Sequence, residues 1–203
     1  MSTRTDADGR RARGDLTRQR AARAAADIAT THGLDSISVG ELARTTGSSK
    51  SGLLTVFGTR EAIQVAAVAE AREVYIAHVI APAWGRPEGR ERLHALIDAW
   101  VDYLRAGVFP GGCFIAATSV EYGHRDGPVA QAVRDLKSEW LRLLADQLTA
   151  AGSARPEDDA FRIDAFLAMG NARRELYDDL TELDRARAFA REVIDGCDVG
   201  SGA

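Results

Sequence analysis

Cysteine and long apolar runs are scarce in this sequence of 203 residues. Its two cysteines, Cys113 and Cys197, are too few and too far apart for a disulfide framework or a zinc site, so we expect reduced thiols. No apolar run reaches the roughly 18 residues that indicate a transmembrane helix. The Arg-rich first residues precede no apolar stretch, so they do not resemble a secretory signal. We therefore expect a cytoplasmic protein without a membrane partner.

Sequence patterns of catalysis and nucleotide binding are also missing. There is no G-x-G-x-x-G, no H-E-x-x-H, no C-x-x-C and no nucleophile elbow around Ser119. Side chains that could perform chemistry are scattered singly along the chain, at His78, His94, Cys113, Glu121 and His124. We expect no enzyme activity, no cofactor and no metal site, and keep an α-helical enzyme only as an alternative.

Strand patterns are lacking, because no segment alternates apolar and polar residues. The five prolines and several glycines instead separate segments of helical periodicity. We predict an all-α chain in which the fourth helix stops before Pro82 and the fifth begins at Pro87. The nine expected helices cover residues 16–31, 39–46, 50–57, 59–80, 87–107, 112–122, 128–151, 156–180 and 181–196.

Residues 38–61, SVGELARTTGSSKSGLLTVFGTRE, have the pattern of two short helices joined by a tight turn. Ser38 and Glu41 match an S-x-x-E capping box, and Ser49 can cap the second helix. Gly47 stands where the first helix must end with positive φ, which glycine adopts at little cost. This is the layout of a helix-turn-helix, whose second helix enters the DNA major groove, although any pair of packed helices could share it.

The two faces of this segment separate clearly. The residues expected to face inward are Leu42, Ala43, Leu53, Val56 and Phe57. The residues expected to point outward from the second helix are Lys50, Ser51, Leu54 and Thr55. The outward set is mostly polar, as a surface that lies against DNA requires.

The longer run TRQRAARAAADIATTHGLDSISVGELARTTGSSKSGLLTVFGTREAI resembles the N-terminal domain of the TetR family of bacterial transcription regulators. The similarity covers residues 17–63 and includes the HG turn, S-V-x-E-L-A, G-S-S-K-S-G-L and F-x-T-R-E-A; GGCFIAATSVEYGHRDGPV resembles a branch of the family more weakly. Three positions depart from the family pattern. Ser48 replaces an apolar residue, Leu54 an aromatic one and Val56 a frequent His, so the phosphate contacts differ from the usual ones.

The resemblance implies a TetR-like architecture: an N-terminal three-helix domain with the helix-turn-helix, then a C-terminal helical domain for ligand binding and dimerisation. We divide the chain into a disordered basic arm (1–15), a DNA-binding domain (16–58), an effector-binding and dimerisation domain (59–197) and a tail (198–203). Residues 1–60 carry a net charge of +4 and the remainder −8, as expected for a polyanion-binding head on an acidic body.

The expected partner of the head is a double-stranded DNA operator. Side chains assigned to phosphates are Arg11, Arg13, Ser38, Ser49, Lys50 and Arg60. Side chains assigned to base edges are Ser48, Ser51, Leu54 and Thr55. Glycines Gly111 and Gly112 fit either a close backbone approach or a helix start, and we favour the helix start.

The resemblance also implies a small-molecule effector, of unknown identity, inside the second domain. The residues assigned to its pocket are Tyr75, His78, Trp100, Tyr103, Phe114, Thr118, Glu121, Tyr122 and Trp140. Filling of the core is an equally good interpretation of these aromatic residues.

The last two helices carry more apolar surface than a small domain needs, and the resemblance implies that they form a homodimer interface. We assign to it Phe166, Gly170, Tyr177, Ala186, Phe189, Ala190 and Val193; simple closure of the monomer core is the alternative. The resulting hypothesis is a repressor that binds a palindromic operator as a homodimer and is released by its effector. A DNA-binding dimer without an effector remains the alternative.

Overall fold

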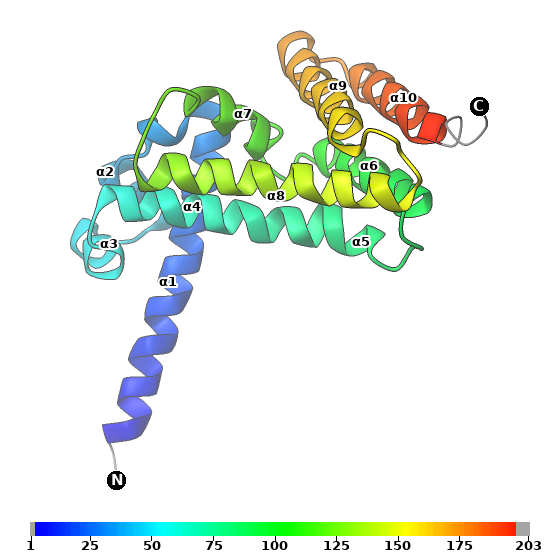
Figure 1. Ribbon diagram of the computed structural model, residues 1–203. Coiled ribbons are helices and arrows are strands. Elements are labelled where there is room, and N and C mark those ends of the chain that lie inside the picture. Colours follow the sequence, from blue (N-terminus) through cyan, green and yellow to red (C-terminus); the bar gives the residue numbers. More distant parts are fainter. Residues whose placement is uncertain (1–2, 198–203) are drawn as a thin grey trace.

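The computed structural model describes residues 3–197, which fold as helices with no strand among them (Figure 1). The head, residues 3–58, contains α1 (Thr3–His32), the 3₁₀ helix η1 (Leu34–Ser36), α2 (Val39–Thr46) and α3 (Lys50–Phe57). The body, residues 59–197, contains α4 (Arg60–Tyr75), η2 (Ile76–Ile80), α5 (Ala81–Ala83), α6 (Arg90–Arg105), α7 (Phe114–Glu121), α8 (Pro128–Ala150), α9 (Pro156–Tyr177) and α10 (Thr181–Asp195). With α4, η2 and α5 counted as one helix, the described residues form nine α-helices, which confirms the predicted fold class.

Helix α2 begins and ends, and α3 begins, at the predicted caps. The Ser38 hydroxyl accepts a hydrogen bond from the Glu41 N–H at 3.1 Å, and the Ser49 hydroxyl accepts one from the Gly52 N–H at 3.0 Å. Gly47 closes α2 with a φ of 67°. These contacts satisfy backbone groups that a helix end leaves unpaired, so the local sequence fixes where α2 and α3 lie along the chain.

The first helix differs from the prediction, because it begins at Thr3 rather than at residue 16. Residues 3–15, which we expected to be disordered, continue α1 in the N-terminal direction as a long projecting helix (Figure 1). Four of these residues are arginine, a strong helix former, and none is proline, although the segment also contains two glycines and three aspartates. Residues 1–2 of the expected arm and the expected tail, 198–203, lie outside the described residues.

The fourth helix also differs, since it continues through Pro82 instead of stopping before it. Residues Ile76–Ile80 form a π-helical turn, in which the Ala81 N–H bonds to the Ile76 carbonyl five residues back. Proline lacks an N–H and its ring crowds the preceding turn of an α-helix. A wider turn directly before Pro82 relieves that crowding, which explains how the helix extends to Ala83.

The helix expected from Pro87 begins at Arg90 instead. Gly89 precedes it with a φ of 86°, and its N–H donates to the buried side-chain oxygen of Gln147 at 3.1 Å. The backbone therefore turns at Gly89 before α6 starts. We had placed the start at Pro87 because proline is frequent in the first turn of a helix, and that preference gives no information on this turn.

One connected apolar core extends from the buried alanines of α1 to the end of α10. Helices α4 and α8 lie side by side along the body, and α9 packs against both α8 and α10 (Figure 1). Gly170 of α9 faces Ala186 of α10 so closely that a Cβ atom at position 170 would overlap the alanine methyl group. This pairing of small residues lets the last two helices pack tightly within one chain.

Candidate DNA-binding surface and effector groove

Helix α3 presents a polar face to solvent from a rigid base. Its Leu53 and Phe57 side chains are buried, whereas Lys50, Ser51 and Thr55 are exposed. Leu54 lies among these exposed residues with 44% of its surface accessible. The inward and outward sides of this helix therefore match the prediction, except that Val56 is only half-buried.

Contacts from α1 hold α3 in place. The Arg18 guanidinium donates to the Val56 carbonyl at 2.6 Å and lies 4.9 Å from the centre of the Phe57 ring. Because Val56 and Phe57 belong to the last turn of α3, the arginine satisfies a carbonyl at the helix end. The helix that carries the exposed polar face is thus fixed from the side opposite that face.

The other side chains assigned to DNA differ in whether contacts within the protein already engage them. Lys50 lies against Gly40 of α2, where a Cβ atom would come within 3.2 Å of the lysine Cε. Arg60 donates from Nε to the Ile37 carbonyl at 2.7 Å and also bonds to the Asp35 carbonyl. Arg60 therefore joins the start of α4 to the loop before α2. The backbone of positions 11 and 13 belongs to α1, whereas the side chains of Arg11 and Arg13 lie outside the described residues.

Ser38, Ser48 and Ser49 lie around the helix starts. The Ser38 and Ser49 hydroxyls serve as helix caps, and the Ser49 hydroxyl also lies 3.3 Å from the Ser51 hydroxyl, in a hydrogen bond in which either can donate. Ser48 follows Gly47 and is half-buried, less accessible than the exposed residues of α3. The structure thus places Ser48 and Ser49 at the amino end of α3, where a helix favours negative charge, whereas Ser38 lies at the amino end of α2.

A polar junction joins the head to the body at the end of α7. The Glu121 carboxylate accepts hydrogen bonds from the Leu34 N–H at 2.7 Å and the Asp35 N–H at 2.9 Å. It therefore caps η1, the turn that connects α1 to the helix-turn-helix. Gly33 is tight against this carboxylate, since a Cβ atom there would lie 3.0 Å from an oxygen of Glu121.

Asp35 supplies the second half of this junction. Its carboxylate accepts from the Tyr122 hydroxyl at 2.9 Å and pairs with Arg125. The hydrogen bond from Arg125 is the main reason that the pKa of Asp35 lies below its ordinary value of 3.8. A lowered carboxyl pKa stabilises the folded state above that ordinary value, and the contribution is lost only as the pH falls through the lower, folded value. The contacts of the Asp35 carboxylate therefore persist through mildly acidic solution.

A second contact between head and body lies at the other side of α1. The Gly111 N–H donates to the Thr30 hydroxyl at 3.2 Å, and a Cβ atom at position 111 would overlap the Thr30 carbonyl. Arg23 reaches the Val108 carbonyl and lies 4.5 Å from the centre of the Phe109 ring. The glycine pair is thus a site of close backbone approach rather than the helix start that we favoured, and α7 begins only at Phe114.

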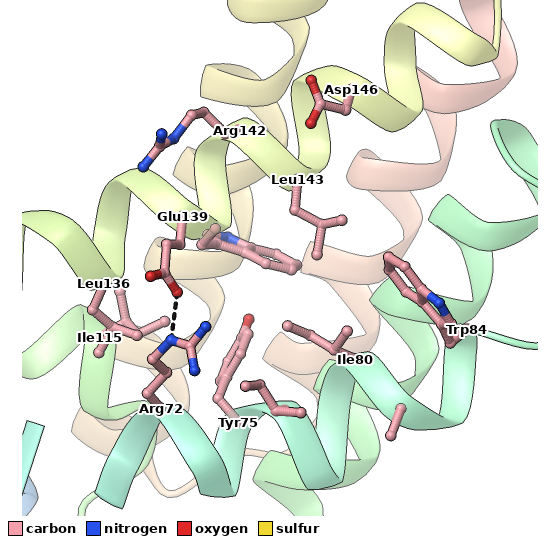
Figure 2. A pocket seen from close by; sticks show the side chains of 13 residues that line it. Arg72, Tyr75, Ile80, Trp84, Ile115, Leu136, Glu139, Arg142, Leu143 and Asp146 are labelled. Carbon is pink, nitrogen blue, oxygen red and sulfur yellow. Dashed lines mark hydrogen bonds and ion pairs between the residues drawn. The ribbon is translucent and has the colours of Figure 1, made fainter. Parts of the chain in front are cut away.

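A groove of about 830 Å³ opens between the α4–η2–α5 helix and α8 (Figure 2). Its walls are mostly apolar and aromatic, and charged side chains stand at its edge. The lining residues used below are Arg72, Tyr75, Ile80, Trp84, Glu139 and Leu143. A volume of this size is within the range of small-molecule sites, which is roughly 300–1,000 Å³.

Comparison with known proteins decides the family. A family model described as the tetracyclin repressor-like C-terminal domain matches residues 89–190, about half of the chain and entirely within the body. The chain belongs to the TetR family. The matched region and the head residues 17–63, which carry the resemblance by motif, do not overlap, so the two indications are independent. A search of curated proteins finds no match.

Solved TetR-family structures share the fold over most of their length. A regulator from Chloroflexus aurantiacus is 22% identical with a TM-score of 0.80, over 90% of this chain and 96% of that one. A regulator from Streptomyces coelicolor is 19% identical with a TM-score of 0.78, over 89% and 95%. AibR, solved with isovaleryl coenzyme A and operator DNA, is 15% identical with a TM-score of 0.68, over 86% and 98%. At these identities the likeness concerns the fold.

Within this TetR fold, the residues assigned to an effector separate into four places. Tyr75 and Trp140 line the groove with ring centres 5.3 Å apart. Trp100, Tyr103, Phe114 and Thr118 are core residues, and the Thr118 hydroxyl bonds to the Phe114 carbonyl. His78 is exposed, whereas Glu121 and Tyr122 belong to the head–body junction. The structure thus brings only two of the nine residues to the groove.

The sequence analysis did not select most of the groove. Trp84, which is 54% exposed, and the apolar Ile80 and Leu143 were not among the assigned residues. Trp84 lies between Pro82 and Pro87, outside the expected helices, and this position is a signal that could have indicated the site. In the structure the Arg92 guanidinium lies 4.7 Å from the centre of its ring. The Arg72–Glu139 ion pair joins residues 67 positions apart, so no local sequence pattern predicts it.

The residues of α9 and α10 that we assigned to a dimer interface fall into a buried group and a more exposed group. Gly170, Ala186, Ala190 and Val193 are buried within the chain, where they pack α9 against α10 or the core. Tyr177 and Phe189 are exposed, and Phe166 is half-buried beside Phe189. A further apolar stripe runs along α9 at helical spacing, formed by the exposed residues Phe161, Ala165, Met169, Ala172 and Leu176.

No described helix has the length and apolar character needed to cross a membrane.

Proposed function

We propose that this TetR-family protein is a repressor of transcription that binds a palindromic operator as a homodimer. The observation that carries the proposal is the exposed polar face of α3, held on a capped helix-turn-helix by buried Leu53 and Phe57. In this geometry the exposed Lys50 and the serines at the start of α3 contact phosphates. Ser51, Leu54 and Thr55 then face the base edges in the major groove.

A dimer is supported by the apolar stripe on α9. Five exposed residues, two of them alanines, follow one face of this helix, and the large side chains Phe161, Met169 and Leu176 are 70%, 59% and 74% exposed. Continuous apolar surface of this kind marks an interaction site in a monomer of this size. Pairing α9 and α10 with their copies in a two-fold dimer would bury the stripe and set the two α3 helices for two half-sites.

An effector is supported by the groove and by the path from it to the head. Tyr75 lines the groove at the end of α4, and Arg60 at the beginning of the same helix holds the loop before α2. A molecule that prefers one position of α4 would change the spacing of the two α3 helices and lower operator affinity. That effect is limited by the difference between its affinities for the two states. The AibR complex, with an acyl coenzyme A and operator DNA together, supports the pairing of both ligands in one such fold.

The test is selection of genomic DNA fragments by the purified protein, followed by a gel shift with a bound fragment. We expect enrichment of fragments that contain an inverted repeat, and loss of the shifted band when an effector is added. Equal recovery of all fragments would contradict the operator, whereas specific binding that no small molecule reverses would contradict the effector alone.

A further inference from the structure

The charged groups around the groove leave no unbalanced charge for a ligand. Arg72 and Glu139 form an ion pair at 2.7 Å across one end, and Arg72 also bonds to Glu73 at 3.1 Å. The other two charged lining residues, Arg142 and Asp146, extend from α8 away from the space between the helices (Figure 2). The four charged lining residues therefore sum to zero, and the inner walls are apolar.

Between the helices, a charged ligand would lose hydration without gaining a free counter-charge, because Arg142 and Asp146 point away from this space. Removal of an ion from water costs several kcal/mol unless a partner charge replaces the lost hydration. An anion would have to compete with Glu139 for Arg72, and a cation would have to compete with Arg72 for Glu139. A neutral molecule avoids both penalties and gains from burial of apolar surface.

The Tyr75 hydroxyl faces this space. The tyrosine is 5% exposed, and its hydroxyl points into the groove from the last turn of α4 (Figure 2). Its ring is held edge-on between Tyr103 and Trp140, with centres 5.8 and 5.3 Å away. The hydroxyl makes no hydrogen bond to another described residue. The hydroxyl oxygen is accessible from the groove, so a ligand that offers an acceptor can take this hydrogen bond in place of water.

Tyr75 stays protonated, because its burial raises the pKa of the phenol well above the ordinary value of 10.0. The hydroxyl is therefore available as a donor at any physiological pH. The π-helical turn directly after it, Ile76–Ile80, contributes Ile76 and Ile80 to the same wall. Such turns often occur at functional sites, where they redirect side chains that a regular helix would place elsewhere.

We infer that this groove binds a neutral, mostly apolar molecule that presents a carbonyl or similar hydrogen-bond acceptor to the Tyr75 hydroxyl. The inference rests on the proposed effector role of the groove and adds the chemical class of the ligand. Trp84 and Leu143 cover its apolar part, and Trp140 offers an aromatic surface beside Tyr75.

Three fluorescent probes test the ligand class. N-phenyl-1-naphthylamine is neutral, 1-anilinonaphthalene-8-sulfonate has the same skeleton with an anionic group, and 6-propionyl-2-dimethylaminonaphthalene is neutral with a carbonyl acceptor. Titrated into the full chain, the two neutral probes should bind with increased emission, and the anionic probe about tenfold more weakly than its neutral analogue. Equal or tighter binding of the anionic probe would overturn the neutral class.

The variant Tyr75→Phe tests the acceptor contact. Loss of one hydrogen bond should lower the affinity for 6-propionyl-2-dimethylaminonaphthalene, the carbonyl probe, about fivefold. The affinity for N-phenyl-1-naphthylamine, which has no carbonyl, should not change. The variant Ala81→Trp should fill the groove and abolish binding of both neutral probes, whereas Ala106→Trp, on exposed surface away from the groove, should not. Unchanged affinity of the carbonyl probe in Tyr75→Phe, or of both probes in Ala81→Trp, would overturn the assignment.

Operator binding measured on the same samples separates the two proposals. If the probes bind as expected but do not release DNA, the ligand class stands and the effector role fails. If no probe binds while DNA binding is intact, the inference fails and the DNA-binding proposal stands.

Discussion

Lys50 stands alone as an exposed cation on α3, at the helix end where phosphates are expected. If it contacts a phosphate, Lys50→Ala should weaken binding to every DNA sequence and reduce the slope of log affinity against log salt by about one per protomer. Gel shifts at several salt concentrations measure this slope. The control Arg86→Ala removes one exposed positive charge from the loop before α6 and should leave the slope unchanged. An unaltered slope for Lys50→Ala would exclude the phosphate role.

Glu121 is the residue on which the head–body junction depends most directly. Glu121→Ala would leave the Leu34 and Asp35 N–H groups without their acceptor, and should lower the free energy of unfolding by about 1–3 kcal/mol. Urea unfolding followed by circular dichroism measures the change. Asp102→Ala, which removes an exposed carboxylate from α6, should shift the midpoint little. Equal midpoints for the two variants would contradict the capping role of Glu121.

The role of Glu121 shows why individual site residues were hard to predict. The sequence offered it as an acid among aromatic residues, and we assigned it to the effector. Its partners Leu34 and Asp35 lie 87 and 86 positions away, so no local pattern connects them. Trp100 and Tyr103 were ambiguous for a similar reason, because aromatic side chains of the core and of a pocket have the same helical spacing.

At the scale of elements, the helix-turn-helix, α2 and α3, was the most predictable part of the molecule. The ends of α2 and α3 depend on Ser38, Gly47 and Ser49, and each of these acts on backbone groups within a few positions of itself. Short-range capping of this kind can be inferred from sequence alone.

The continuation of α4 through Pro82 could not be inferred in this way. It requires a π-helical turn whose Val79, like Ala83 after it, is buried against the rest of the body. Proline rules describe the local cost of the residue in a regular helix and do not include the wider turn before it or the packing of that turn. The start of α6 at Arg90 likewise depends on Gln147 of α8, which holds the N–H of Gly89.

The loop before α7 gives a direct test of how the elements meet. Gly111→Ala would place a methyl group on the Thr30 carbonyl of α1, so we expect a loss of about 1–3 kcal/mol in the free energy of unfolding. The matched control is Gly123→Ala, where the nearest atoms to an added Cβ lie at an ordinary 3.6 Å. Thermal or urea unfolding compares the two. A Gly111→Ala protein as stable as the control would contradict the close approach of α1 and the loop.

At the scale of the whole molecule, one chain presents one α3 helix, and a palindromic operator requires two. The α9 stripe is the surface that would join them, since its apolar residues remain exposed after the described chain has folded. Burial of Phe161, Met169 and Leu176 in a symmetric dimer would be a strong driving force for association. The resemblance implied that these two helices form an interface, and the small residues that we assigned to it pack within the monomer.

The most direct measurement is the mass of the protein–DNA complex on a selected operator, by analytical ultracentrifugation, for the natural chain and for Met169→Arg. We predict two chains per palindrome, half-sites about 10–10.5 base pairs apart or a multiple of this, and a monomeric Met169→Arg protein with little operator affinity. Gln131→Arg, with the same charge on an exposed face of α8, should behave as the natural chain. One chain per operator, or a Met169→Arg protein that still binds as a pair, would contradict the account.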